Sequence, residues 1–354
     1  MRNLYTILII TLSVIINFSS CTTNEVRDDR YGGTFKINAS DVPDIVFPGR
    51  VLKQSEQLIV NQVYTGLVKY NTRSIEIVPS LATKWRAERN QTLYTFYLHN
   101  DAYFHRDRCF ENKGIRQITA YDVKYSMEQI AKFHVRNHHE ISSQLLNIEG
   151  SDGIVDSLSD IESLNISGIK VVNDTVIVFE LKESDPLFLH YLASTNSLVF
   201  AHEAFETYGF ESTVGSGAYI FSYPSIKGQA MSLLANPDYF QHNRHQYQLP
   251  FVDTIIVSFI TSPPKELVLF ENDELDMIIG ISGDYVIDFL DRHIDQFQSN
   301  PPYYIMKQVT DSQKNLNYNF IRSNVQNMHI NSIGYFDFSE IYFKDPAVQE
   351  IVIN

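Results

Sequence analysis

Two histidines with helical spacing are the residues of this sequence whose types and spacing best suit metal chemistry. His134 and His138 stand at i and i+4, and His139 and Glu140 follow directly. Side chains with this spacing share one face of a helix, so two imidazoles could face one Zn²⁺ ion. The segment around them is largely polar, however, and no second group of ligands has definite spacing. We therefore interpret the pair as solvated histidines at a helix end and predict no metal site.

Two further groups of titratable residues have looser spacing. The first follows a predicted strand and consists of His99, Asp101, His105 and Cys109. We interpret it as a polar loop. The second lies between a predicted helix and a predicted strand and consists of Glu271, Asp273, Glu274 and Asp276. Neighbouring carboxylates can perform general acid/base catalysis, but a solvated turn explains these four without perturbed pKa values, so we interpret them as structural.

The sequence motifs of common hydrolases and nucleotide-binding enzymes do not occur. The sequence contains no Gly-x-Ser-x-Gly, no His-Glu-x-x-His and no phosphate-binding loop ending in Lys-Ser or Lys-Thr. Val214-Gly215-Ser216-Gly217 contains Gly-x-Gly, but a dinucleotide site needs a third glycine at the start of a helix, and here a strand is predicted to follow. We interpret this segment as a turn or a close backbone approach. The sequence therefore predicts neither catalytic residues nor a cofactor.

The N-terminus has the composition of a secretory signal. Met1-Arg2-Asn3 precede the apolar run 4–18, and Ser19-Ser20 precede Cys21. The run has about 15 residues, whereas an apolar helix needs about 20 to cross a membrane, so a cleaved signal peptide at 1–20 is predicted. Small residues before a cysteine favour attachment of a diacylglycerol to Cys21, which would tether the protein to the membrane. The alternative is an ordinary secreted protein in which Cys21 is incidental.

Composition limits the classes of partner and the means of stabilisation. The formal net charge is −14 and no Lys/Arg-rich run compensates it locally, so nucleic acid is excluded as a partner. Hydrophobic residues make up 44% and charged residues 20%, which is typical of a globular chain. If Cys21 carries lipid, Cys109 has no partner for an intramolecular disulfide. Packing must then stabilise the fold, and the 21 Tyr and 23 Phe supply large side chains for it.

Alternating and helical patterns predict a mixed α/β protein. Helix-opening signals include Thr119-Ala120-Tyr121-Asp122, which resembles a capping box, and a proline at the start of 263–271. The predicted helices are 56–64, a helix following Thr119, and 263–271. The predicted strands are 34–39, 92–98, 169–172, 175–181, 217–223, 229–235, 254–260 and 276–279. Asn173-Asp174 is predicted as the turn of a hairpin.

Several of these segments resemble one family in their sequence and in their order. They are Gly32-Gly33-Thr34, 63–68 (VYTGLV), 78–85 (VPSLATKW), the alternating Tyr94, Phe96 and Leu98, Phe104-His105, 118–127 (ITAYDVKYSM), 214–219 (VGSGAY), 236–240 (NPDYF) and 249–253 (LPFVD). The chain thereby resembles the extracytoplasmic solute-binding proteins of family 5, the dipeptide and oligopeptide receptors of ABC importers. It departs from the family at four positions, which are Phe47, Thr65, Ser216 and Ala218.

The resemblance implies a periplasmic-binding-protein type II-like α/β fold with a mixed-sheet lobe, a β-rich subdomain and an incomplete second lobe. The implied division is a signal peptide at 1–20, a tether at 21–30, lobe I at 31–80 and 211–310, an inserted α+β subdomain at 81–210, and the start of a truncated lobe II at 311–354. It also implies an extracytoplasmic protein, lipid-anchored to a bacterial membrane, with a peptide or other small solute and an ABC permease as partners. Lys53-Gln54-Ser55 resembles the loop that lies beside the ligand in the family; the alternative is a solvated loop.

The last residues of the sequence lead us to expect that the chain is truncated. Asp345 and Pro346 are good first residues of a helix, and Val348, Ile351 and Val352 form an apolar stripe that ends with the sequence at Asn354. The family normally continues well beyond this point; the alternative is a C-terminal helix docked on existing structure. If half of a roughly −8.2 kcal/mol interaction is lost, binding weakens from about micromolar towards millimolar.

The sequence thus predicts the binding lipoprotein of a peptide import system, weak-binding or inactive as given. The first alternative is a surface lipoprotein that keeps one lobe as an interaction or structural module. An enzyme ranks third because the search for catalytic residues found none.

Overall fold

The structure is a computed structural model of the chain. It describes residues 29–39, 41–44, 46–51, 53–137, 139–152, 154, 164–226, 230–297, 303–309, 316–330 and 335–344. The predicted signal peptide, the lipidation site Cys21, His138 and the predicted helix from Asp345 onward lie outside these residues. Within the described ranges, no helix is long and apolar enough to cross a membrane.

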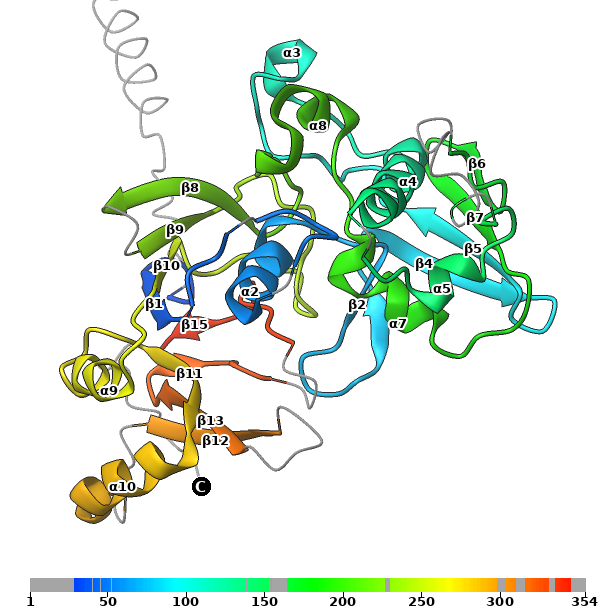
Figure 1. The fold of residues 1–354 in the computed structure, drawn as a ribbon. Coiled ribbons are helices and arrows are strands. Elements are labelled where there is room, and N and C mark those ends of the chain that lie inside the picture. Colours follow the sequence, from blue (N-terminus) through cyan, green and yellow to red (C-terminus); the bar gives the residue numbers. More distant parts are fainter. Residues whose placement is uncertain are drawn as a thin grey trace, which may run out of the picture.

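A seven-stranded mixed sheet forms the centre of the fold (Figure 1). Its strands are β1 (Thr34–Asn38), β8 (Tyr219–Ile226), β9 (Ala230–Ala235), β10 (Thr254–Ser258), β11 (Met277–Ser282), β12 (Tyr303–Val309) and β13 (Leu316–Arg322). Their order is β12-β13-β11-β1-β10-β9-β8. The middle strand β1 runs parallel to both β10 and β11, whereas the outer pairs are antiparallel. The predicted mixed α/β architecture is therefore confirmed.

The segment from β10 to β11 is a β-α-β unit, as predicted. Its helix α9 (Pro263–Glu271) has the predicted bounds and begins with proline. Proline lacks an N–H group, but N–H groups in the first turn of a helix have no hydrogen-bond partner within it, so no bond is lost. The strand pair predicted on either side of 226–228 is confirmed as the antiparallel strands β8 and β9. Because β11 and β10 lie on either side of β1, the unit places their carboxyl ends beside that of β1.

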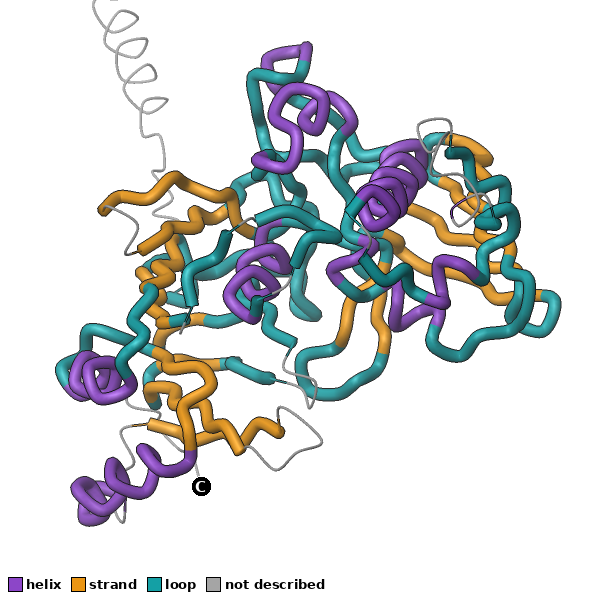
Figure 2. The backbone as a smooth tube through the Cα atoms, viewed as in Figure 1, coloured by secondary structure: helices purple, strands orange, loops and turns teal. Residues whose placement is uncertain are grey.

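Helices cover both faces of this sheet (Figure 2). Phe35 and Ile37 of β1 are fully buried in a hydrophobic cluster with Leu58 and Val63 of α2 (Gln54–Val63). On the opposite face, a second cluster joins α9, α10 (Gly283–Phe297) and strands β11 to β13. A surface helix buries one apolar stripe, so α2 covers one face of the sheet, and α9 and α10 cover the other face at β11 to β13.

A separate four-stranded antiparallel sheet carries the helix with the predicted capping box. Its strands are β4 (Ala82–Glu88), β5 (Leu93–Leu98), β6 (Ile169–Asn173) and β7 (Val176–Glu180), in the order β4-β5-β7-β6. Helix α4 (Ala120–Arg136) packs on β6. The hairpin β6–β7 is confirmed, but its turn is Asp174-Thr175. Asn173 is the residue before the turn. Its side chain stabilises the turn by accepting a hydrogen bond from the Thr175 N–H (3.0 Å).

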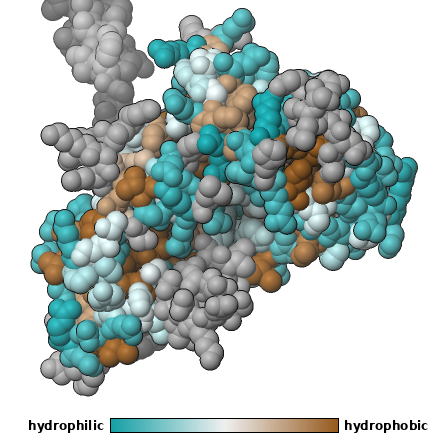
Figure 3. Space-filling model, viewed as in Figure 1, coloured by the Kyte–Doolittle hydropathy of each residue, from teal (hydrophilic) through white to brown (hydrophobic). Residues whose placement is uncertain are grey.

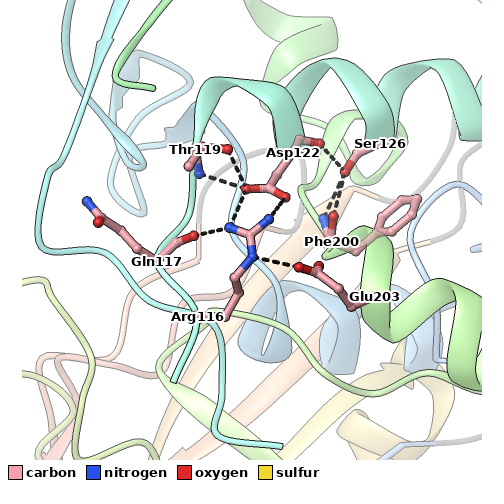
Figure 4. A network of polar contacts seen from close by, with 7 residues as sticks. All are labelled: Arg116, Gln117, Thr119, Asp122, Ser126, Phe200 and Glu203. Carbon is pink, nitrogen blue, oxygen red and sulfur yellow. Dashed lines mark hydrogen bonds and ion pairs between the residues drawn. The ribbon is translucent and has the colours of Figure 1, made fainter. Parts of the chain in front are cut away.

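The start of α4 is fixed by a buried polar network (Figure 4). The Asp122 carboxylate accepts hydrogen bonds from the Thr119 N–H (2.7 Å) and hydroxyl (2.9 Å), which confirms that Thr119 and Asp122 cap the helix. The Arg116 guanidinium binds both Asp122 oxygens (2.8 and 3.2 Å) and also Glu203 (2.8 Å). Ser126 joins the helix to the Phe200 backbone. These contacts connect the start of α4 to one segment distant in sequence, which contains Phe200 and Glu203.

The remaining elements are short connections. They are β2 (Val68–Tyr70), β3 (Ile77–Pro79), α3 (Glu111–Gly114), α5 (Ser143–Leu146), α7 (Phe188–Leu192), η2 (Thr195–Ser197), α8 (His202–Tyr208), η3 (Gly209–Glu211), β14 (Val325–Gln326) and β15 (Tyr342–Phe343). On the face drawn in Figure 3, hydrophilic residues predominate and hydrophobic ones form scattered patches. That distribution is typical of a surface in contact with water.

Candidate functional site

The structure places Lys53, Gln54 and Ser55 together at the start of α2. Gln54 is exposed, whereas Ser55 is buried and its hydroxyl donates to the Asp41 carboxylate (2.6 Å). The Lys53 ammonium turns towards the preceding loop, where it pairs with Asp44 (2.7 Å). The hydrogen bond to Asp44 raises the pKa of Lys53, so its charge is already engaged. Of these three residues, Gln54 is the one with a side chain available to a solute.

A small depression lies beside these residues, where β1 ends. It is lined by Ala39, Asp41, Gln54, Ser55, Leu58 and Ile279. Ala39 follows the last residue of β1, and Ile279 belongs to the parallel strand β11. In open α/β sheets, ligands bind outside the carboxyl ends of parallel strands where the strand order reverses, which is the place that this depression occupies. A hydroxyl, an amide and a carboxylate there can hydrogen-bond a polar solute but supply no activated nucleophile.

Asp41 belongs to this candidate site, but the sequence analysis did not select it. Its signal was its position, because it follows the strand 34–39 directly and polar residues at that end of a parallel strand face the ligand crevice. Ile279 had no local signal. Only the pairing of β11 with β1 brings it beside α2.

A buried carboxyl group lies on the other face of the same strand. Asn38 donates through Nδ2 to Glu266 Oε1 of α9 (2.7 Å) and to the Ile260 carbonyl (3.0 Å). Burial raises the pKa of Glu266 to about 7, and the hydrogen bond from Asn38 opposes this shift only partly. The sequence analysis did not select Glu266, since nothing local distinguishes it from the other acidic residues of 263–276.

We expect Glu266 to make stability fall as the pH rises. The folded state keeps its proton up to a pKa of about 7, whereas the unfolded chain loses it near 4.5. The folded state therefore binds more protons between these values, and the free energy of unfolding should fall across this window by up to about 3 kcal/mol. Glu266→Gln should remove this slope and be the more stable protein at pH 8. Urea unfolding at a series of pH values measures it.

Glu274→Gln is the control for this prediction, because Glu274 is exposed and should leave the slope unchanged. Equal slopes for the wild type and Glu266→Gln would show that Glu266 is ionised in the folded protein.

The four acidic residues interpreted as structural do not converge on one site. Asp276 accepts a hydrogen bond from the Lys36 N–H (2.8 Å), and burial raises its pKa, so the expectation of unperturbed pKa values was wrong for this residue. Asp273 pairs with Arg322. Glu271 pairs with Arg292 (3.4 Å), and Glu274 is exposed. Their contacts join a turn to neighbouring elements.

Of the histidines singled out from the sequence, His134 and His139 are neighbours, with ring centroids 5.8 Å apart. Both ring nitrogens of His134 contact backbone carbonyl oxygens, of Gly49 (2.9 Å) and Glu140 (3.1 Å), so they are engaged within the protein. His99 lies near Asp101 (3.3 Å), and the Cys109 N–H donates to Asp107 instead. In the part of the chain that the structure describes, no three His, Cys, Asp or Glu residues are arranged to hold a metal ion.

His105 and the Gly-x-Gly segment form a close backbone contact, as interpreted from the sequence. The buried His105 ring accepts the Gly215 N–H at Nδ1 (3.3 Å) and contacts the Gly217 carbonyl through Nε2 (3.0 Å). Burial lowers the pKa of His105 to about 4, so the ring is neutral. A Cβ at Gly215 would lie 1.9 Å from the Val63 carbonyl oxygen. Only glycine allows this approach to the end of α2.

Two of the positions that depart from the family pattern contact each other beside this segment. The hydroxyls of Thr65 and Ser216 form a buried hydrogen bond. At Phe47, a third such position, the ring is buried among Phe200, Phe205 and Phe210. These departures therefore have structural partners within the chain.

Comparison with known proteins extends these observations. A family model described as "Bacterial extracellular solute-binding proteins, family 5 Middle" matches residues 76–348. The nickel-binding periplasmic protein of Escherichia coli is 23% identical over 305 residues, which cover 83% of this chain and 48% of that protein. The dipeptide-binding protein of the same organism is 26% identical over 141 residues, which cover 40% and 24%.

Solved structures show the same fold. DppA from Helicobacter pylori, in complex with the peptide STSA, superposes with a TM-score of 0.60 at 20% identity, covering 80% of this chain and 52% of that one. OppA from Haemophilus influenzae, in complex with RPPGFSPFR, gives 0.61 at 17%, covering 78% and 50%. The chain thus spans about half the length of these structures.

Proposed function

The chain belongs to the bacterial extracellular solute-binding proteins of family 5, and we propose from this that it binds a peptide or another small solute for an ABC importer. Its fold is that of the type II periplasmic binding proteins, as the sequence resemblance implied. The proposed role is binding and delivery to a membrane permease rather than catalysis, and the proposed location is outside the cytoplasm.

The observation that carries this proposal is the group of polar side chains at the carboxyl end of β1. Gln54 presents an exposed amide there, and Ser55 and Asp41 hold each other beside it. An amide both donates and accepts, which suits the alternating N–H and C=O groups of an extended peptide. The names of the relatives include dipeptide, nickel, murein peptide and heme binding, so family membership leaves several solutes open. We propose a peptide because the site offers amide and carboxylate oxygens rather than a metal-ligand cluster.

Titration calorimetry with di- and oligopeptides tests this function. We expect Gln54→Ala to weaken peptide binding about fivefold to tenfold, since one hydrogen bond contributes about 1 kcal/mol. Gln57→Ala is a matched control, because Gln57 is an exposed glutamine of the same helix that does not line the depression. Equal losses from both substitutions, or saturable binding of a nickel complex but of no peptide, would contradict the proposal.

We also propose that Cys21 carries a lipid that tethers the protein to the membrane, which rests on the sequence of the N-terminal segment alone. In a bacterial host, the wild type should sediment with membranes and incorporate labelled fatty acid. Cys21→Ser should lose the label and appear in the soluble fraction. Cys109→Ser is the matched control because Cys109 is the other cysteine of the chain and should leave both properties unchanged. Labelling that persists in Cys21→Ser would disprove the anchor.

A further inference from the structure

An open cavity of about 390 Å³ lies beside the β2–β3 hairpin. Segments that are distant in sequence line it: the β2–β3 hairpin, a loop around Arg244, and the described residues Asn327, His329, Asp337, Glu340 and Tyr342. It has no lining residue in common with the depression beside Gln54. A ligand in this cavity would therefore contact residues that the proposed function does not use.

The charge of the cavity is opposite to that of the whole protein. Among the residues that the structure describes, its lining includes the cations Arg30, Lys69, Arg73 and Arg244 and the carboxylates of Asp337 and Glu340. Lys69 and Asp337 pair with each other (2.6 Å), so this pair adds no net charge. Arg73 and Arg244 then lie with the one remaining carboxylate of the described lining, that of Glu340, in a chain whose formal charge is −14. A concave cationic lining focuses its potential and attracts anions.

Arg73 and Arg244 are held in place by neutral partners. The Arg73 guanidinium donates to the Asn327 side-chain oxygen (3.1 Å), and Arg244 Nε donates to His245 Nε2 (3.0 Å). Among the described residues, neither arginine forms an ion pair with a carboxylate. A guanidinium has several N–H donors, so each of these two keeps donors for an oxyanion.

The pKa of His329 and the aromatic residues of the cavity lining also favour binding of an organic anion. Burial and the nearby Arg73 charge lower the pKa of His329, which Glu340 raises to a lesser degree. Phe251 and Tyr342 line the cavity as aromatic rings, and Arg30 lies over the Tyr247 ring (3.8 Å to its centroid). A cavity of this size suits a small organic molecule.

We propose that this cavity binds a small organic anion through Arg73 and Arg244. The ligand carries carboxylate or phosphate oxygens that accept from both guanidinium groups, and its carbon skeleton lies against Tyr342. This site is separate from the solute site beside Gln54.

Calorimetric titration with citrate and with inorganic phosphate tests the proposal, and glucose serves as an uncharged probe. We expect saturable binding of at least one anion, weaker at high salt, and no binding of glucose. Stronger binding of citrate or of phosphate identifies the preferred oxyanion. Arg73→Gln and Arg244→Gln should each weaken it about tenfold, because a charge-assisted hydrogen bond is lost. Arg86→Gln, an exposed arginine of the four-stranded sheet, is the control and should bind as the wild type.

Circular dichroism of each variant checks folding. Anion binding that is unchanged in the Arg73→Gln/Arg244→Gln double variant, or equally weakened in Arg86→Gln, would overturn the proposal, as would no saturable binding by the wild type. Gln54→Ala separates the two sites, since it should keep anion binding whatever its effect on peptide binding.

Discussion

Replacing Arg116 with methionine should destabilise the protein by about 2–4 kcal/mol, because it leaves a buried carboxylate without its cation. Asp122 is only 2% exposed and holds the start of α4, where Arg116 binds both of its oxygens. Methionine keeps most of the aliphatic volume of arginine, so packing changes little. We place the loss at the lower end of the range for buried pairs because Thr119 still donates two hydrogen bonds to Asp122. Urea unfolding measures the difference.

The loss from Arg116→Met should grow with pH. Burial raises the pKa of Asp122 and Arg116 opposes that shift, so removing Arg116 raises the pKa further. The folded variant then keeps a proton that the unfolded chain releases above about pH 4, and its stability falls as the pH rises towards 7. The double variant Arg116→Met/Asp122→Asn should recover part of the loss, since no unpaired charge remains. A loss that is independent of pH and is not recovered would show that Arg116 acts through packing alone.

Gly215→Ala should destabilise the protein by about 3 kcal/mol or more, because the new methyl group would collide with rigid backbone. The Cβ would lie 1.9 Å from the Val63 carbonyl oxygen, which also accepts the hydrogen bond from the Gly217 N–H (2.8 Å). Moving the loop away to make room would break this bond and the two between His105 and Gly215. The thermal unfolding midpoint should fall by several degrees or more.

Gly209→Ala provides the comparison for this prediction. A Cβ at Gly209 meets nothing within 4 Å, although its φ of +59° disfavours any side chain. We expect a loss of about 1–2 kcal/mol from the backbone conformation alone. If Gly215→Ala were no worse than Gly209→Ala, the approach of the loop to α2 would be looser than the structure shows.

The helices with local start signals were those best predicted from the sequence. The cap of Thr119 and Asp122 and the proline at 263 act on backbone groups within one helical turn, so the information lies within a few neighbouring residues. The predicted turn of the β6–β7 hairpin lay one residue before the observed turn. The side chain of Asn173 stabilises the turn from its first position, and sequence alone does not distinguish that role from a central one.

The acidic residues show that a shifted pKa cannot be predicted from the sequence. Glu271, Asp273, Glu274 and Asp276 attract attention because they are clustered, yet the carboxyl group with a strongly raised pKa is Glu266. Its pKa depends on burial against Asn38, which lies 228 positions away in the chain. Desolvation is a property of the assembled core and has no local sequence signature.

By itself the sequence determined the α/β class and the main helices, because local periodicity and capping record these. The motifs and their order determined the family resemblance, from which the region beside the proposed solute stays a prediction. Only the tertiary structure decided that Asp41 and Ile279 complete the proposed solute site and that Arg73 and Arg244 share a cavity. Sheet pairing and loop packing bring such residues together from positions hundreds of residues apart. No pattern within one segment predicts these contacts, because they form only when the whole core assembles.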